Sequence, residues 1–322
     1  MSWITSSAPG KVILFGEHFV VEGQPAIAIA VSLRAYVTVE PTQSDEIKVY
    51  SKNFDLTETF PLNQRDSWTG KMTPVAVAAY TAMLEADKKT GLNIHIDSQI
   101  PPGSGMGSSA AVAVATVHAT SLALGLQLDP RKVSDLAYEA EKVVHGKPSG
   151  IDNTIATFGG AIAYRKGEGF IQLKPIFRGV KLVLADTGKP RNTGEMVRRV
   201  LALKNTYPSI LDPIYYSAGK LVVEAAQLLE KGDYENLGIL MNINHGLLSA
   251  VGVSTKEIEL LVHTARENGA LGAKLTGAGG GGYIVALCRE NDAEKIISAL
   301  RSHATSVLTV NLEETGVRKE NI

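Results

Sequence analysis

The sequence predicts an α+β protein with two domains, and three observations lead to this fold class. A chain of 322 residues is long enough for two domains of roughly 150 residues each. In the first half, short segments alternate apolar and polar residues with the period of β-strands and are mixed with fewer helical patterns. After about residue 178, longer helical patterns predominate. We therefore expect one domain over residues 1–178 and a second over residues 179–322.

The strands of the first domain are expected at residues 11–16, 34–41, 46–51 and 92–97. Their alternation predicts an antiparallel sheet with helices packed against it. In the second domain the helical pattern covers residues 193–205, 212–231, 234–246 and 254–268. A strand, a glycine-rich loop, a strand, a helix and a strand follow, so the second domain is expected to be a helix-rich α+β unit.

The composition narrows the classes of partner. The chain carries 32 Lys and Arg against 33 Asp and Glu, a formal net charge of −1, so nothing electrostatic favours nucleic acid or an anionic membrane. The single cysteine, Cys288, lies in the apolar run "YIVALC" and is expected to be a buried core thiol, as suits a reducing cytosol. The N-terminus has no signal-peptide pattern and no window reaches a membrane-spanning length. We expect a soluble cytoplasmic protein.

The segment "APGKVILFGEH", residues 8–18, contains polar residues at both ends of a short apolar run. Pro9 and Gly10 precede a short predicted strand, residues 12–15, which ends at Gly16, and Glu17 and His18 occupy the next turn. Taken singly, Lys11 is explained as a solvated lysine and His18 as a structural histidine. Their joint placement at the two ends of one strand favours a functional site.

A second segment, "PPGSGMGSSAA" at residues 101–111, lies between a predicted strand and an alanine-rich helix. Backbone N–H groups that glycine leaves uncovered at a helix N-terminus bind phosphate through hydrogen bonds and the helix dipole. The stretch lacks the spacing of a P-loop, and its glycines at 103, 105 and 107 miss G-x-G-x-x-G. By itself it is equally well explained as a turn.

A third segment, "KLTGAGGGG", satisfies G-x-G-x-x-G at residues 277–282. The dinucleotide fingerprint requires a helix after its glycines, whereas a β-rich run over residues 283–288 follows here. We therefore reject dinucleotide binding. A glycine-rich turn between two strands instead allows another backbone, or the phosphate loop itself, to approach closely.

Two carboxylate residues, Glu141 and Asp152, lie between the second and third segments and are candidates for the site. Asp129 as N-cap and Pro130 begin a predicted helix that Gly146 ends, and on this helix Glu141 lies at the edge of the apolar stripe. Glu139 faces water instead. A carboxylate at the edge of a buried face requires a partner, which is either a metal cation or a salt bridge. Asp152 follows the turn "KPSG", which could hold its carboxylate in a fixed direction.

The three segments, in this order and at these separations, resemble the three motifs of the GHMP small-molecule kinases, and the resemblance spans nearly the whole chain. "GEHFVVEG" and "VVHGKPSGIDN" are most similar to the mevalonate kinase branch, of the short archaeal or bacterial kind. A galactokinase would continue its first motif as "GEHTDY", and a diphosphomevalonate decarboxylase would lack "PGKVILFGEH". The resemblance implies the two-domain GHMP kinase fold, with the active site in the interdomain cleft.

The resemblance also implies a role for each motif residue. The ATP phosphates are expected against Pro102, Gly103, Ser104, Gly105, Met106, Gly107, Ser108 and Ser109. Ser109 and Glu141 are the implied ligands of Mg²⁺, which bridges the β- and γ-phosphates. Asp152 accepts the proton of the substrate hydroxyl, and Lys11 assists it and steadies the transferred phosphoryl group. The implied substrate-binding or supporting residues are Glu17, His18, Ser149, Asp152, Arg191 and Thr193. Gly277, Gly279 and Gly280 form a loop expected to pack beside the phosphate loop.

The implied activity is the phosphorylation of mevalonate by ATP, which yields 5-phosphomevalonate for isoprenoid precursor synthesis. Two alternatives remain at this point: a related kinase acting on phosphomevalonate or a sugar, and a catalytically silent relative used as a binding module. The silent relative would be marked by loss of Lys11, Ser109, Glu141 or Asp152, and all four are present. Members of the family commonly form dimers, so a homodimer is expected from the resemblance alone.

Overall fold

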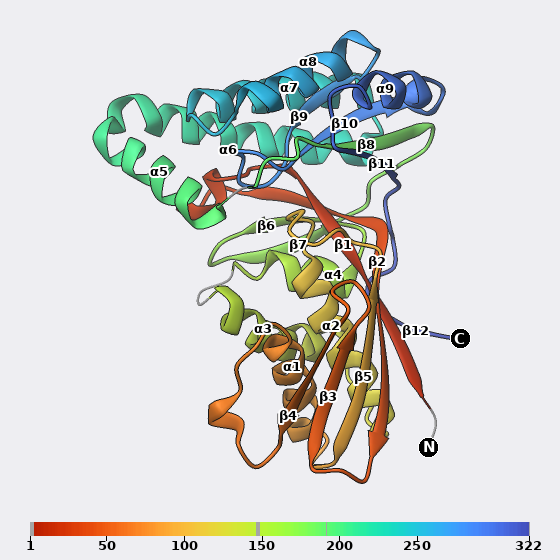
Figure 1. The fold of residues 1–322 in the computed structure, drawn as a ribbon. Coiled ribbons are helices and arrows are strands. Elements are labelled where there is room, and N and C mark those ends of the chain that lie inside the picture. The colour runs from red at the N-terminus through yellow and green to blue at the C-terminus, as the bar shows by residue number, and fades with distance from the viewer. Residues whose placement is uncertain (1–2, 146–148, 191, 322) are drawn as a thin grey trace. The chain divides into compact units, whose positions relative to one another are not determined.

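The computed structural model describes residues 3–145, 149–190 and 192–321 and contains both helices and sheets, as predicted (Figure 1). Contacts divide the chain into an N-terminal unit, residues 1–11, 30–159 and 313–322, and a C-terminal unit, residues 12–29 and 160–312. Strands β1 (Ile4–Phe15) and β2 (Ala26–Thr42) contribute residues to both units. The boundary near residue 178 concerns the domains of the family and stays a prediction.

The N-terminal unit is built on a sheet with the strand order β12-β1-β2-β5-β3-β4. The further strands are β3 (Glu46–Ser51), β4 (Leu56–Pro61), β5 (Gly91–Ser98) and β12 (Arg318–Glu320). In β5 the side chains of Leu92, Ile94 and Ile96 are buried while His95 and Asp97 are exposed, which confirms the predicted alternation.

Two sequence predictions for this sheet were wrong. The first strand begins at Ile4 rather than near Val12, because residues 5–7 pair with β12 at the far end of the chain. The sheet is also not purely antiparallel, since β3 and β5 run parallel. The crossover between them contains the helix α1 (Thr73–Glu85), and a connection of this length permits parallel pairing.

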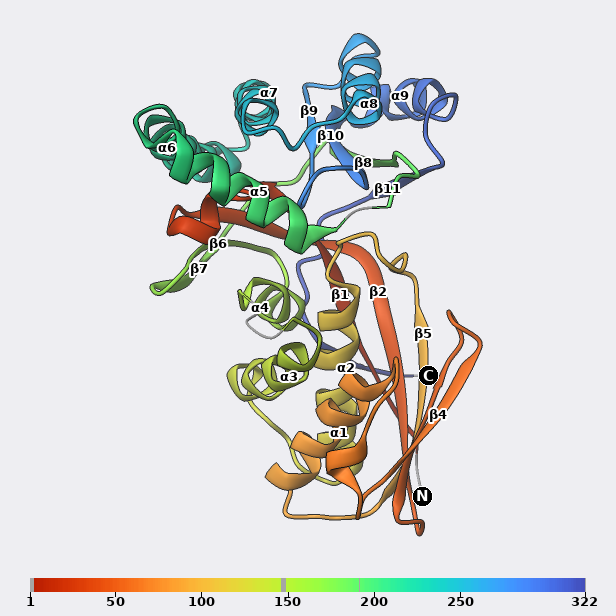
Figure 2. The same ribbon diagram turned by 60° about the vertical axis from the view of Figure 1, so that its left-hand side comes forward.

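Four helices cover one face of this sheet (Figure 2). They are α1, α2 (Ser108–Ala123), α3 (Pro130–His145) and α4 (Ile151–Phe158). Asp129 caps α3 as predicted, its Oδ1 accepting from the Lys132 N–H at 3.0 Å. Alanine provides five of the ten buried residues of α2, and its small side chain lets α1 and α3 pack closely against this helix.

The C-terminal unit is built on an antiparallel sheet with the order β11-β8-β10-β9. Its strands are β8 (Val180–Asp186), β9 (Gly272–Leu275), β10 (Tyr283–Arg289) and β11 (Ser306–Val310). A hairpin of β6 (Ala161–Arg165) and β7 (Gly169–Leu173) pairs with residues 26–29 of β2. Its helices are α5 (Thr193–Thr206), α6 (Pro208–Lys231), α7 (Tyr234–Ala250), α8 (Lys256–Glu267) and α9 (Ala293–Leu300).

These helices confirm the predicted helical segments of the second half to within a few residues. Side-chain N-caps on Asn192, Asp233 and Thr255 begin three of them. Cys288 lies in the core, where burial raises the pKa of its thiol to about 11, so the prediction of a buried core thiol is confirmed. None of the helices in the described ranges is both long enough and apolar enough to cross a bilayer.

Candidate active site

The glycine-rich segment 101–107 connects β5 to α2, as predicted, and its glycines have left-handed backbone conformations. Gly103, Gly105 and Gly107 have φ values of 71°, 71° and 70°. Gly107 is the N-cap of α2 and carries no side chain, so the first amide groups of α2 are left for an external acceptor. An anion is the natural acceptor at such a helix N-terminus.

A backbone hydrogen bond joins the first motif, residues 8–18, to this loop. The Lys11 N–H donates to the Met106 carbonyl oxygen at 2.9 Å. A Cβ atom at Gly10 would lie 3.1 Å from the same oxygen, so a larger residue would press on the loop. Met106 and Ser104 are buried, and the Ser104 Oγ accepts from the Met106 N–H at 3.3 Å. The loop is therefore fixed to β1 by this backbone hydrogen bond and by the close packing of Gly10.

Lys11 and Asp152 form an ion pair beside the loop. Lys11 Nζ lies 3.3 Å from Asp152 Oδ1, and the two side chains are 8% and 33% exposed. Asp152 is in the first turn of α4, where the helix dipole favours a carboxylate. A Cβ atom at Gly107 would lie 3.1 Å from Lys11 Cγ and 3.7 Å from Asp152 Oδ2, so glycine there leaves room for the pair.

Glu141 of α3 is a second carboxylate at the same place, and its side chain is 4% exposed. Burial raises the pKa of the Glu141 carboxyl to about 8, and the Asp152 carboxylate adds to the rise, while the Lys11 ammonium and a hydrogen bond with Ser109 oppose it. Glu139 is exposed and pairs with Lys142 at 2.7 Å. The prediction that Glu141 lies at the buried face and Glu139 in water is confirmed.

Ser109 and Glu141 fit a Mg²⁺ ion. Mg²⁺ prefers hard oxygen ligands and is commonly held by one or two carboxylates together with substrate phosphates and waters. Burial first, and then the second carboxylate, raise the pKa of Glu141, and a cation would supply the counter-charge that its ionised form needs. In the part of the chain that the structure describes, no cluster of three or more His, Cys, Asp or Glu side chains could form an all-protein metal cage.

A pocket of about 260 Å³ opens beside the phosphate loop. Pro102, Gly103, Ser108 and Ser109 of the loop and of α2 are part of its lining. The remaining wall is mainly apolar and includes Phe54, Met72, Val75, Ile96, Ile100 and Val112. No pattern in the sequence predicted this pocket, because its walls come from separate elements that meet only in the fold. A mainly apolar pocket with a few polar groups in its lining is typical of a small-molecule site.

In the C-terminal unit, Glu17 forms a buried ion pair with Lys274 of β9. Its second oxygen accepts from Asn244 Nδ2 at 3.2 Å. Burial lowers the pKa of the Lys274 ammonium, opposed by the charge of Glu17. Lys274 was not among the predicted site residues, although it begins the third motif.

His18 adopts a left-handed conformation with φ 62°, which is uncommon for a residue other than glycine. Its Nε2 lies 2.8 Å from the Ala278 carbonyl oxygen, so the first motif contacts the third. Burial lowers the pKa of His18, while the bond with Ala278 and the charge of Glu17 oppose the effect. Such strain is frequently found at functional sites.

The loop over residues 276–282 packs against other backbone segments, as predicted. The Gly280 N–H donates to the Val253 carbonyl oxygen at 2.8 Å, and a Cβ atom at Gly279 would lie 2.3 Å from that oxygen. Gly277 also has a positive φ, 80°. The close approach of another backbone is confirmed, and packing beside the phosphate loop stays a prediction.

The remaining predicted substrate residues are placed as follows. Ser149 is exposed just before α4, and its Oγ accepts from the Ile151 N–H at 3.4 Å. Thr193 is exposed at the start of α5. Arg191 lies outside the described residues, as does Gly146, the predicted end of α3. Their roles stay predictions.

Two family models match the chain. The model of the GHMP kinases N terminal domain matches residues 74–160, and that of the GHMP kinases C terminal matches residues 225–305. A curated mevalonate kinase of Thermococcus sibiricus is 41% identical over 333 residues, which cover 99% of each chain.

Solved structures agree with these matches. The Methanococcus jannaschii mevalonate kinase has a TM-score of 0.87 at 28% identity, over 97% of this chain and 98% of that one. The L. major mevalonate kinase in complex with R-mevalonate has a TM-score of 0.83 at 33% identity, over 96% of each chain. Together with the three motifs, the matches establish that the chain belongs to the GHMP kinase family.

Proposed function

We propose that this protein is a mevalonate kinase, which transfers the γ-phosphoryl group of ATP to the primary hydroxyl of mevalonate and forms 5-phosphomevalonate. The observation that carries the proposal is the Lys11–Asp152 ion pair beside the glycine-rich start of α2. The 41% full-length identity with a curated mevalonate kinase supports mevalonate as the acceptor. A cytoplasmic location and a homodimer are parts of the proposal that rest on the single cysteine and on the family.

ATP binds with its phosphates against the segment 102–109. The positive φ values of its glycines and the free amide groups of α2 support this placement. The apolar pocket beside the loop is the candidate site for the base and ribose, because it adjoins Pro102 and Gly103. Ser109 and Glu141 would hold Mg²⁺, which would supply positive charge to neutralise the ATP phosphates.

Asp152 accepts the proton of the acceptor hydroxyl as its oxygen attacks the γ-phosphorus. The new O–P bond forms while the bond from the γ-phosphorus to the bridging β–γ oxygen breaks, and ADP leaves with that electron pair. Lys11 is within ion-pair distance of the Asp152 carboxylate, and its ammonium stabilises negative charge on the attacking and transferred oxygens. The partial burial of both side chains strengthens these electrostatic effects.

On the acceptor side we assign mevalonate contacts to His18, Ser149, Arg191 and Thr193, by resemblance. We assign Glu17 a supporting role, because both of its carboxylate oxygens already have partners in Lys274 and Asn244. The turn that carries His18 is thereby held on one side by a buried ion pair and on the other by Ala278.

The proposal is tested by an acceptor panel with ATP and Mg²⁺, measured as ADP release. Mevalonate, phosphomevalonate, galactose and homoserine are compared with a reaction that contains no acceptor. We expect mevalonate to give the highest kcat/KM and the Asp152→Asn variant to remove this activity. A higher kcat/KM with phosphomevalonate or galactose would establish the related-kinase alternative, and ATP binding without turnover on any acceptor would establish the silent relative.

A further inference from the structure

The last residues of the chain return to the N-terminal unit and cross the elements that carry the candidate catalytic residues. We call residues 313–320 the C-terminal strap; they begin where the Glu313 N–H donates to the Ala30 carbonyl oxygen at 3.0 Å. None of the three family motifs includes the strap, and no role in the proposed reaction has been given to it above.

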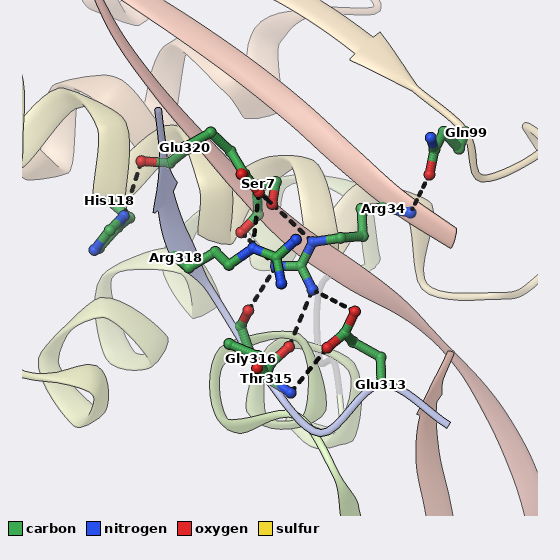
Figure 3. A network of polar contacts seen from close by, with 10 residues as sticks. Ser7, Arg34, Gln99, His118, Glu313, Thr315, Gly316, Arg318 and Glu320 are labelled. Carbon is green, nitrogen blue, oxygen red and sulfur yellow. Dashed lines mark hydrogen bonds and ion pairs between the residues drawn. The ribbon is translucent and has the colours of Figure 1, made fainter. Parts of the chain in front are cut away.

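Arg34 of β2 joins the strap to the sheet, as Figure 3 shows. Its side chain is 2% exposed. Nη1 donates to the Thr315 carbonyl oxygen at 3.0 Å and lies 3.3 Å from Glu313 Oε2, while Nη2 donates to the Gly316 carbonyl oxygen at 2.6 Å. Nε and Nη2 also donate to Ser7 Oγ and the Ser7 carbonyl oxygen. One buried guanidinium therefore fixes the strap to β1.

The strap lies directly against the C-terminal end of α4, the helix that carries Asp152. The Val317 N–H donates to the Thr157 carbonyl oxygen at 3.1 Å. A Cβ atom at Gly316 would lie 1.9 Å from the same oxygen, and one at Gly159 would lie 2.4 Å from the Gly316 nitrogen. These two backbones touch without side chains between them, so a shift of the strap must be transmitted to α4.

The distance from this contact to the catalytic group is short. Thr157 and Asp152 are five residues apart, about 7.5 Å along a helix at 1.5 Å per residue. Because α4 has only eight residues, we expect a displacement of its C-terminal end to displace its first turn as well. On its other side Asn153 Nδ2 donates to Ser134 Oγ of α3 at 2.8 Å, so α4 is held between α3 and the strap.

The strap also contacts β1, the strand that carries Lys11. Its final residues form β12, which pairs with residues 5–7 of β1. Glu320 accepts hydrogen bonds from Ser7 Oγ and from Arg318 Nε. The strap thus connects the strand of Lys11 with the helix of Asp152.

We propose that the C-terminal strap positions Asp152 against Lys11 for phosphoryl transfer, and that Arg34 is the positioning residue that fixes the strap. The inference rests on the proposed function. A misplacement of about 1 Å can cost a reaction of this kind about 100-fold in rate. The phosphate loop and the apolar pocket do not contain strap residues, so a shifted strap should alter turnover and leave ATP binding intact.

Two variants disturb the contact in different ways. Arg34→Lys keeps the positive charge and removes the fork that binds the carbonyl oxygens of the strap. Gly316→Ala pushes directly on α4. Lys319→Gln is the matched control, because Lys319 belongs to the same strap and its side chain is exposed. Initial rates are measured well below the midpoint of thermal unfolding, and hydrogen exchange of the α4 amides is followed by mass spectrometry.

We expect kcat with mevalonate to fall about 10- to 100-fold in Arg34→Lys and in Gly316→Ala, with KM for ATP within twofold of the wild type and faster exchange in α4. Lys319→Gln should keep its kcat. If kcat is unchanged in Arg34→Lys, or falls equally in Lys319→Gln, the strap has no positioning role. If Gly316→Ala fails to fold, the kcat and the KM for ATP of Arg34→Lys alone decide whether the strap has a positioning role. A wild type that is inactive on mevalonate refutes the proposed function itself.

Discussion

Glu141→Gln should make the metal-free protein more stable at alkaline pH. The pKa of the Glu141 carboxyl is raised in the folded protein from 4.5 to about 8, and the side chain is 4% exposed. A group with a raised folded-state pKa binds its proton more tightly in the folded protein than in the unfolded chain. Its contribution to the free energy of unfolding is therefore fully present below pH 4.5 and is lost as the pH rises towards 8.

The magnitude follows from this shift. One pKa unit corresponds to about 1.4 kcal/mol, so the whole shift corresponds to about 5 kcal/mol. A change from pH 6 to pH 9 covers the last two pH units below the folded-state pKa of about 8. Over this change the free energy of unfolding of the wild type should fall by about 3 kcal/mol relative to Glu141→Gln. This is a large part of the 5–15 kcal/mol typical of a folded domain.

The assay is urea unfolding at pH 6 and pH 9 with EDTA present, followed by tryptophan fluorescence. Both tryptophans, Trp3 and Trp68, belong to the N-terminal unit, so the signal reports the unit that contains Glu141. Glu139→Gln is the control, because Glu139 lies on the same helix and is exposed. An equal pH dependence in the wild type and in Glu141→Gln would refute the reasoning, and so would an equal effect of Glu139→Gln.

Three further predictions concern the site. Asp152→Asn should lower kcat by ~100-fold or more with little change in KM for mevalonate, since it removes a positioned base; recovery with excess Mg²⁺ would contradict this role. Gly105→Val should weaken ATP binding in calorimetry while the fold survives, because a side chain would occupy the phosphate space; unchanged affinity would exclude the loop. Lys274→Met should lower the free energy of unfolding by about 3–5 kcal/mol, because it leaves Glu17 buried and unpaired. Combining it with Glu17→Gln should restore most of the loss in thermal unfolding, and no recovery would show that the ion pair is not the cause.

The helices of the second half were predictable because their signals are local. Amphipathic spacing and an N-cap residue lie within a few residues of each helix end, and α8 is recognised from Thr255 and the stripe that follows it. The same holds for α3, whose cap and apolar stripe also located Glu141 at the buried face. Where the physical cause of an element lies inside the element, the sequence reports it.

The missed features have causes elsewhere in the chain. The first residues of β1 pair with β12, whose Glu320 lies 313 residues after Ser7 in the sequence. No local pattern therefore marks the true start of the strand. Lys274 is buried only because Glu17 lies against it, 257 residues earlier in the sequence. The apolar pocket requires β5, α1 and α2 to be placed together. Such features follow from tertiary pairing, which periodicity does not contain.

The charges at the site explain why a kinase would keep a residue as costly as Glu141. Lys11 supplies one positive charge against the two carboxylates of Glu141 and Asp152, and Asp152 is the more exposed of the two. Burial and the neighbouring Asp152 carboxylate together raise the pKa of the Glu141 carboxyl to about 8, so without a cation Glu141 holds a proton below that pH. A bound cation would favour the charged form of Glu141. Loading of the site with metal would thus release that proton and make Glu141 a charged oxygen ligand.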